Sequence, residues 1–187
     1  MAKLGTDAIM ADVYASIPAA GVAGRLYWAT DTKRLYRDSG SAWVELGYTE
    51  GARVYHSATQ SIANNTVTTL TFDSESYDTS GIHEAVINPT RLTCQTAGKY
   101  LIYGMAKWAD NTTGFRGLYL WVNQTTYIAA VQNTATPQGV REHLIMMLYN
   151  MVAADYVEMR AVQSSGGALD IQRASDDATI FGMHRIG

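Results

Sequence analysis

Short stretches of alternating hydrophobic and polar residues, separated by turn-forming residues, occupy most of the chain after residue 51. These stretches are rich in Thr, Tyr, Val and Ile, the residue types that favour a pleated, half-buried strand. Clusters of Asn, Gly, Pro and Ser recur about every ten residues, a spacing typical of an all-β sandwich or barrel. The predicted strands cover residues 52–57, 66–72, 82–88, 99–108, 116–123, 126–132, 140–150, 155–163 and 178–186, and residues 168–174 form either a further strand or an ordered loop.

Three of these predicted strands, 99–108, 116–123 and 140–150, are hydrophobic on both faces. An antiparallel sandwich normally wets one face of each sheet, so these strands need a second covering layer. The sequence predicts no helix that would supply this layer, and we therefore expect another copy of the chain to cover it in an obligate oligomer. The residues expected in the core or at the contact between subunits are Tyr103, Met105, Leu118, Leu120, Trp121, Ile145, Met147 and Tyr149.

Residues 24–46 have the pattern of a small hairpin followed by a third strand. The triplet Arg-Leu-Tyr occurs twice, at 25–27 and 34–36. A turn at Asp31-Thr32 places Tyr27 opposite Tyr36 and Trp28 opposite Leu35. Cross-strand aromatic pairs of this kind stabilise a hairpin by ~0.2–1 kcal/mol each. Residues 42–46 then form a third short strand, and so small a sheet is marginal alone.

The residues before this hairpin allow two interpretations. Thr6 or Asp7 can cap a short helix over residues 8–14 that ends before Pro18. The same residues can equally form an extended arm. No other part of the chain has a helical pattern.

Composition and charge exclude several classes of protein. Of the 187 residues, 47% are hydrophobic and 17% are charged, which excludes disorder of the whole chain. The net charge of −3 gives no basic excess for binding nucleic acid. The single cysteine excludes an internal disulfide framework. The chain has no run of ~18 apolar residues, the length that a transmembrane helix needs. The N-terminus has acidic residues where a signal peptide has its apolar core, so we expect synthesis in a cytoplasm without export.

Five segments between residues 71 and 187 carry a family resemblance. They are 71–73, 96–104, 117–123, 153–159 and 180–187. Their order resembles the C1q-like branch of the tumour-necrosis-factor (TNF) jelly-roll superfamily, over residues 52–187. Ala154 stands where the family's turn usually has glycine, which changes little because Asp155 can still fix the turn through its side chain.

This resemblance implies an all-β, C1q/TNF-like jelly-roll β-sandwich that forms a homotrimer, in agreement with the oligomer expected above. Residues 24–44 are similar, in addition, to a segment that recurs in tailed-phage fibre and virion-surface proteins. Together the two resemblances imply an N-terminal virion-anchoring arm (1–23), a β-hairpin collar or short shaft (24–50) and a jelly-roll head (51–187). The arm residues expected to dock on other virion proteins are Ile9, Met10, Val13, Tyr14 and Ile17.

The implied function is that of a bacteriophage structural protein, a fibre or spike made in the host cytoplasm and carried on the tail or capsid. Its head is expected to attach to a host-surface glycan or protein. The alternative is a capsid or tail decoration protein that stabilises the particle and has no receptor. Charge and hydropathy, as given above, lead us to expect no partner nucleic acid and no membrane insertion, and we expect no cofactor.

Recognition is expected at the end of the head away from the collar. Because antiparallel strands alternate in direction, the loops at 109–115, 133–139 and 164–177 fall at this far end, and those at 89–98, 123–126 and 150–155 fall at the base. Aromatic, amide, hydroxyl and charged groups in the far loops suit a polar ligand such as a glycan. The candidate ligand-binding residues are Trp108, Asp110, Asn111, Thr112, Arg116, Gln132, Asn133, Gln138 and Arg173.

Catalysis finds little support in the sequence. The four histidines lie in predicted strands outside any catalytic motif, and Cys94 is expected to be a buried, inert thiol. Glycoside hydrolysis needs two carboxylates ~5–9 Å apart, and calcium needs several oxygen ligands. The carboxylates to weigh are Asp73, Glu75, Asp78, Glu142, Asp155 and Glu158 for hydrolysis, and Asp110-Asn111 and Asp176-Asp177 for calcium. Turn-forming and ion-pair roles are favoured for all of them, so we expect neither an enzyme nor a metal site.

Overall fold

The computed structural model describes residues 9–47, 50–135, 142–173 and 179–187. The chain divides into two compact units, Met1–Tyr48 and Thr49–Gly187, which we call the N-terminal unit and the head. The division lies close to residue 51, where the sequence predicts that the head begins. The only helix among the described residues is a single 3-10 turn, and no described helix is long and apolar enough to cross a membrane.

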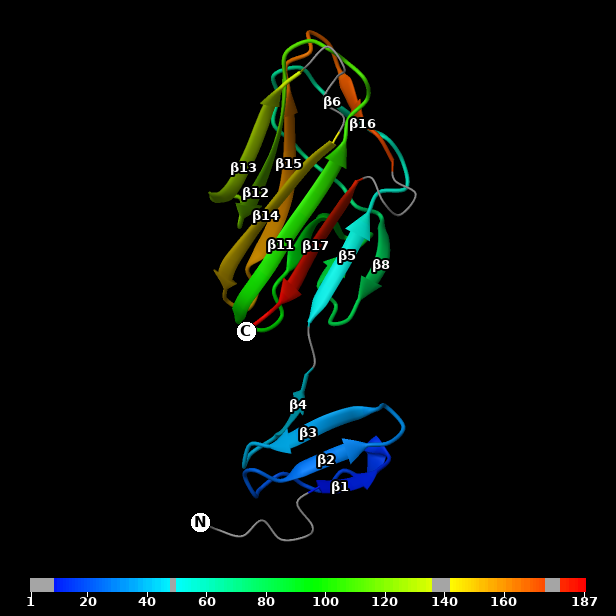
Figure 1. The fold of residues 1–187 in the computed structure, drawn as a ribbon, viewed down its shortest axis with the longest axis vertical. Coiled ribbons are helices and arrows are strands. Elements are labelled where there is room, and N and C mark those ends of the chain that lie inside the picture. The colour runs from blue at the N-terminus through cyan, green and yellow to red at the C-terminus, as the bar shows by residue number, and fades with distance from the viewer. Residues whose placement is uncertain (1–8, 48–49, 136–141, 174–178) are drawn as a thin grey trace. The chain divides into compact units, whose positions relative to one another are not determined.

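The N-terminal unit is one four-stranded sheet with the strands in sequence order (Figure 1). Its first strand pairs in parallel with the second, and the other pairs are antiparallel. Tyr27 faces Tyr36 and Trp28 faces Leu35, so the predicted hairpin register is confirmed. The elements are β1 (Ile9–Asp12), the 3-10 helix η1 (Tyr14–Ser16), β2 (Leu26–Ala29), β3 (Arg34–Asp38) and β4 (Trp43–Leu46).

Of the two interpretations left open for the residues before the hairpin, the helix over residues 8–14 is wrong and the extended conformation is correct for Ile9–Asp12. Ile9–Asp12 is extended because it forms the edge strand β1 alongside β2. Pairing with a ready-made sheet edge supplies backbone hydrogen bonds that a two-turn helix would otherwise make alone, and so short a helix is marginal in water.

Residues 9–23 are built into the N-terminal unit rather than forming a separate arm. Met10 and Ile17, which the sequence suggests as docking residues, are partly buried and pack against the buried side chains of this unit. Trp43 Nε1 donates to the carbonyl of Pro18 over 2.6 Å, and the buried Asp38 carboxylate accepts from the backbone N–H of Val22. The remaining expected docking residues, Ile9, Val13 and Tyr14, are exposed.

The head is a sandwich of two antiparallel sheets (Figure 1). We call the sheet with the order β14-β11-β17-β5-β8 the first sheet. Its strands are β5 (Gly51–Tyr55), β8 (Ser74–Asp78), β11 (Gly98–Lys107), β14 (Glu142–Met151) and β17 (Ile180–Arg185).

The second sheet has the order β13-β12-β15-β10-β9, with β7 paired to β15. A two-stranded ribbon of β16 and β6 completes the head. These strands are β6 (Gln60–Ile62), β7 (Thr68–Thr69), β9 (His83–Glu84), β10 (Asn88–Thr93), β12 (Phe115–Val122), β13 (Thr126–Thr134), β15 (Tyr156–Gln163) and β16 (Leu169–Ile171).

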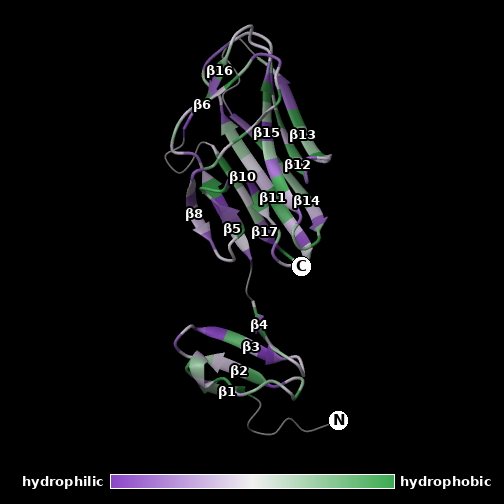
Figure 2. Cartoon of the chain, turned by 180° about the vertical axis from the view of Figure 1, so that it is seen from behind, coloured by the Kyte–Doolittle hydropathy of each residue, from purple (hydrophilic) through white to green (hydrophobic). Residues whose placement is uncertain are grey.

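The core of the head lies between the inward faces of the two sheets. Side chains alternate between core and surface, as the changes of hydropathy along the strands in Figure 2 illustrate. Ile102 and Phe181 of the first sheet and Leu120 and Met159 of the second are fully buried in one cluster. Gly104 leaves room for the Met159 side chain of the second sheet, because a Cβ there would lie 2.2 Å from Met159 Sδ and the methionine would have to move.

The long predicted strands are confirmed, and three shorter strands are missed. The sequence assigns no strand to β6, reads β8 as a turn and places most of β10 in a loop. β8 is a sheet-edge strand of polar residues and therefore lacks the hydrophobic alternation that identifies strands. β10 contains Pro89, whose missing N–H argues against a strand in sequence analysis.

Candidate functional site: an apolar sheet face and the far-end loops

The outward face of the first sheet carries a contiguous group of apolar side chains on two neighbouring strands, β11 and β14. Directly opposed pairs are Leu101 with Leu148, Tyr103 with Met146, and Met105 with Leu144. We call these six residues the apolar face. Leu144, Met146 and Leu148 are 56%, 57% and 61% exposed, so the described residues of the head leave them largely uncovered.

Polar residues bound the apolar face at both ends. Lys99 opposes Asn150 at one end, and Lys107 opposes Glu142 at the other. A hollow of about 380 Å³ opens beside the first of these pairs and is lined in part by Leu148 and Ile186. An apolar centre with a polar rim is the usual anatomy of a protein–protein interface.

An aromatic layer continues the apolar face across β17. The Tyr103 ring lies flat over Gly182, where a Cβ would come within 2.3 Å of Tyr103 Cζ. The His184 ring is parallel to the Tyr103 ring, with an interplanar angle of 4° and centroids 6.1 Å apart. A 2.6 Å hydrogen bond joins His184 Nε2 to the Tyr77 hydroxyl. The parallel rings of Tyr103 and His184 are therefore held in position, as a surface for a second molecule should be.

Burial alters the ionisation of this aromatic layer. Loss of solvent lowers the pKa of His184 below its ordinary value. Loss of solvent, together with a hydrogen bond to Tyr77, raises the pKa of Tyr103. The imidazole of His184 and the phenol of Tyr103 are therefore neutral near pH 7, which lowers the cost of covering them.

The residues predicted for the core or the subunit contact divide between the two. Leu118, Leu120 and Ile145 are buried in the core, and Tyr149 packs against it. Tyr103 and Met105 lie on the apolar face, whereas Met147 is 36% exposed on the inward side of the edge strand β14, opposite Ile102. Trp121 lies on the second sheet. The outward residues of β14, which belong to the apolar face, were not selected from the sequence, because both faces of this strand are hydrophobic.

The far end of the head contains the loops expected there. The end at which β5 begins and β17 finishes is the base, and the antiparallel registers place residues 109–114, 135 and 164–168 at the opposite end. Residues 136–141 and 174–178, which include Gln138 and Asp176-Asp177, lie outside the described residues. The sorting of the described loops by strand direction is confirmed.

Two of the predicted ligand-binding residues, Trp108 and Arg116, are fully buried and cannot contact a ligand at the surface. The Arg116 guanidinium lies 5.9 Å from the Trp108 ring and donates to three backbone carbonyls. The acceptors are Asn111 (3.1 Å), Thr113 (3.0 Å) and Phe115 (2.8 Å). Arg116 thus holds the 109–114 loop from beneath. Loss of solvent lowers its pKa, but a guanidinium stays charged at any ordinary pH.

Gln163 holds the neighbouring loop, residues 164–168, in a similar way, and the sequence analysis did not identify it. Its buried amide donates to the carbonyls of Ile62 over 2.9 Å and Gly167 over 2.7 Å, and accepts from the N–H of Ser165. The Ser164 hydroxyl accepts from the N–H of Phe115, which ties the two loops together. A glutamine at the end of a predicted strand gives no signal of this role.

The other predicted far-end residues remain at the surface. Asp110, Thr112 and Arg173 are exposed, and the half-buried Asn111 accepts the Thr113 N–H through its side chain. Gln132 and Asn133 are also exposed, but on β13, which extends two residues beyond the predicted strand. The far end therefore presents polar groups on loops that buried side chains hold rigid.

The candidate carboxylates are not gathered at one cleft. Glu142 lies at the far-end start of β14, whereas Asp155 binds the Asn123 amide at the base. Glu158 forms an ion pair with Arg160 on the second sheet. Asp73, Glu75 and Asp78 bind Ser57, His83 and the backbone of residues 80 and 83. Among the described residues, no three His, Cys, Asp or Glu side chains gather as metal ligands.

Neither a protein-family model nor a curated protein sequence matches the chain. Solved structures do match it. Murine APRIL superimposes with a TM-score of 0.57 at 12% identity, over 74% of this chain and 100% of that one.

The head is a C1q/TNF-like jelly roll. Two further structures support this fold, each over 74% of the chain. Eiger TNF from S. frugiperda matches over 93% of its length with a TM-score of 0.53 at 11% identity. The globular domain of zebrafish complement 1qA protein matches over 98% of its length with a TM-score of 0.52 at 15% identity. The fold expected from the five sequence segments is confirmed, and the apolar face occupies one outer surface of this jelly roll.

Proposed function

We propose that this chain is a homotrimeric structural protein of a bacteriophage virion, whose jelly-roll head attaches the particle to a bacterial surface. The apolar face is the main observation that supports the proposed trimer. Contiguous apolar patches on a soluble monomer are small and often functional, and this one also has an aromatic extension and a polar rim. A second copy is the occupant that the two-faced strands require, and closed rotational symmetry lets three copies cover one another.

The assignment to a phage virion rests on the N-terminal unit. Residues 24–44 resemble a segment of tailed-phage fibre and virion-surface proteins, and they form the hairpin and third strand expected of that segment. The exposed Ile9, Val13 and Tyr14 are the residues that we propose to contact other virion proteins. The site of action is then the virion surface, on the tail or the capsid.

Attachment is the use that the head's rigid far end supports. Ligand contacts cost less when the contacting groups are already ordered, as they are on the loops held by Arg116 and Gln163. Three copies displayed together convert a weak site into a strong attachment through avidity.

The test is binding of the fluorescently labelled, full-length protein to a panel of bacterial strains. We expect binding to a subset of strains, and a loss of that binding in a form made monomeric through the apolar face. Binding to no strain, with a measurable loss of particle stability when the protein is omitted from the virion, would instead favour the decoration function.

A further inference from the structure

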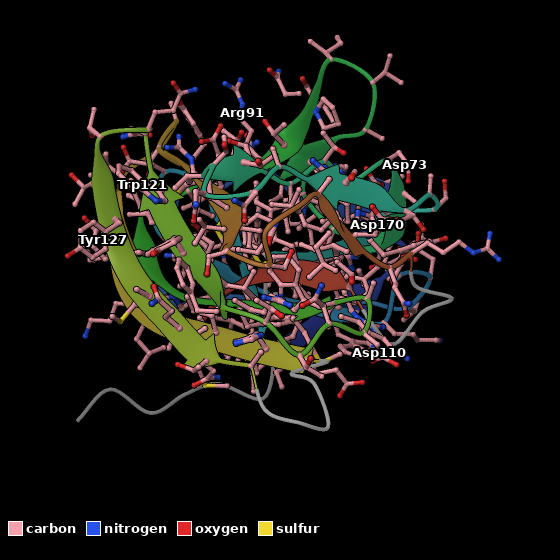
Figure 3. All side chains as sticks on the ribbon, turned by 90° about the horizontal axis from the view of Figure 1, so that it is seen from above. Asp73, Arg91, Asp110, Trp121, Tyr127 and Asp170 are labelled. Atoms are coloured by element: carbon pink, nitrogen blue, oxygen red, sulfur yellow. The ribbon has the colours of Figure 1, made fainter. Side chains whose placement is uncertain are left out.

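A row of aromatic and charged side chains crosses the outward face of the second sheet. Tyr127 of β13 opposes Trp121 of β12, Trp121 opposes Glu158 of β15, and Glu158 opposes Arg91 of β10. At ~4.8 Å between strands, these four residues span about 14 Å. Figure 3 shows Tyr127, Trp121 and Arg91 along one side of the head, with Asp110 on another. We call these four residues the aromatic row.

The aromatic end of the row is exposed and fixed in position. Tyr127 is 62% exposed, and its ring centroid lies 5.8 Å from that of Trp121, with the two planes at 51°. The Arg160 guanidinium lies 4.6 Å from the centre of the Trp121 ring. Arg160 is held in turn by Glu158 Oε2, with bonds of 2.6 Å from Nη2 and 3.2 Å from Nε. The contacts with Tyr127 and Arg160 therefore hold the indole in place before any ligand binds.

The other end of the row presents a cation. Within the described part of the chain, the ion pair of Glu158 is formed with Arg160, which leaves Arg91 with a cation–π contact to Tyr156 at 4.6 Å. Arg91 Nε and Trp121 Nε1 are buried donors without a hydrogen-bond acceptor among the described residues. Two guanidinium groups and one carboxylate give this surface a charge of about +1, on a chain whose net charge is −3.

We propose that the aromatic row is a binding site for acidic glycans. The C–H face of a sugar ring packs on the tilted Tyr127 and Trp121 rings, and a guanidinium fork such as that of Arg91 binds a sugar carboxylate through two parallel hydrogen bonds. Tyr, Trp and Arg are the residues that dominate binding energy at recognition surfaces. This inference rests on the attachment function proposed above, because it names the ligand class and a site for that attachment.

The position of the row makes it compatible with the trimer. It lies on the second sheet, whereas the apolar face lies on the first, and the two look outward from opposite sides of the sandwich. One chain can therefore use its first sheet for association while its second sheet faces a polysaccharide.

The test is calorimetric titration of the full-length protein with hexamers of galacturonate, mannuronate and sialate, and with the neutral maltohexaose. We expect binding of at least one acidic hexamer and no measurable binding of maltohexaose. Tyr127→Ala should weaken that binding about tenfold or more, whereas Tyr127→Phe, which keeps the ring, should retain it. Arg91→Gln should abolish the preference for acidic sugars, and the matched Arg37→Gln in the N-terminal unit should change nothing. Binding of none of the acidic hexamers, or equal binding by Tyr127→Ala, overturns the proposal.

The strain panel separates this inference from the proposed function. If the wild-type protein binds cells and Tyr127→Ala and Arg91→Gln bind them equally well, the attachment function stands and the glycan site is wrong. If the wild-type protein binds no strain, the attachment function fails, and the hexamer titrations still decide whether the row binds sugars.

Discussion

Replacing Met146 by aspartate is the most direct test of the apolar face. Met146 is at its centre, opposite Tyr103, and is 57% exposed in the single chain. Full burial of a methionine side chain contributes ~1.5–3 kcal/mol, so covering the exposed half contributes about 1 kcal/mol per chain. An aspartate loses this contribution and adds an unpaired buried carboxylate, which costs several kcal/mol more. The substitution is present in all three copies of a trimer, so its cost is incurred three times. Because each 1.4 kcal/mol lowers the association constant tenfold, the trimer should dissociate.

The assay is the absolute mass in solution by light scattering on a sizing column, over a range of protein concentrations. We expect the wild-type protein to elute at about three times 20.4 kDa and Met146→Asp to elute as a folded monomer. Val86→Asp is the matched control, because Val86 is 92% exposed at the turn between β9 and β10, outside the apolar face. A wild-type monomer, or a Met146→Asp trimer that persists on dilution, would refute the reasoning from the apolar face.

Three further predictions concern single polar side chains. Arg116→Lys should lower the free energy of unfolding of the head by ~1–3 kcal/mol in urea titrations, because an ammonium cannot reach all three carbonyls and leaves buried acceptors unpaired; an unchanged midpoint would contradict the clamp. For Asp38, burial opposes the charge, but the Arg25 side chain and backbone N–H groups outweigh it and hold the pKa of the carboxyl well below its usual range. The N-terminal unit should therefore be most stable above pH ~4 and lose stability as the pH falls toward the depressed pKa, and Asp38→Asn should remove this dependence in circular-dichroism melts. Loss of solvent already lowers the pKa of His184 in the single subunit, and covering the aromatic layer should lower it further, so the trimer should weaken as the pH falls through the pKa of the free subunit, which lies below the ordinary value of ~6.5. His184→Gln, which keeps a polar group beside Tyr77, should flatten the pH dependence of the trimer fraction in sedimentation velocity, and an unchanged dependence would exclude His184 as its cause.

The parts of the fold that follow from local rules could be predicted from the sequence. The Tyr27–Tyr36 register follows from a turn between two copies of one triplet, and the sorting of loops to two ends follows from strand parity alone. Long strands such as β11 were found because a long, mostly apolar run rich in aromatic and aliphatic residues between turn-forming residues is a strong signal. The polar edge strand β8 has no such signal.

The parts that depend on tertiary packing could not be predicted. Arg116 was assigned to the surface because arginine is rarely buried, and only the fold reveals three carbonyls converging on it. The strand β14 is hydrophobic on both faces, so its sequence predicts a covered surface without showing which side chains lie there. Trp121 was grouped with that surface, although its strand belongs to the other sheet.

The two outward surfaces of the sandwich differ in how their side chains are satisfied, and this difference separates their roles. On the first sheet, Leu144, Met146 and Leu148 gain nothing from water, and only another protein surface of similar shape can satisfy them. On the second sheet, the half-buried Trp121 is already held by Arg160, and Arg160 by Glu158. Such a surface is stable in water without a partner, yet its ordered rings and cation lower the entropic cost of binding one. A chain with these two surfaces can assemble permanently through one sheet and bind reversibly through the other.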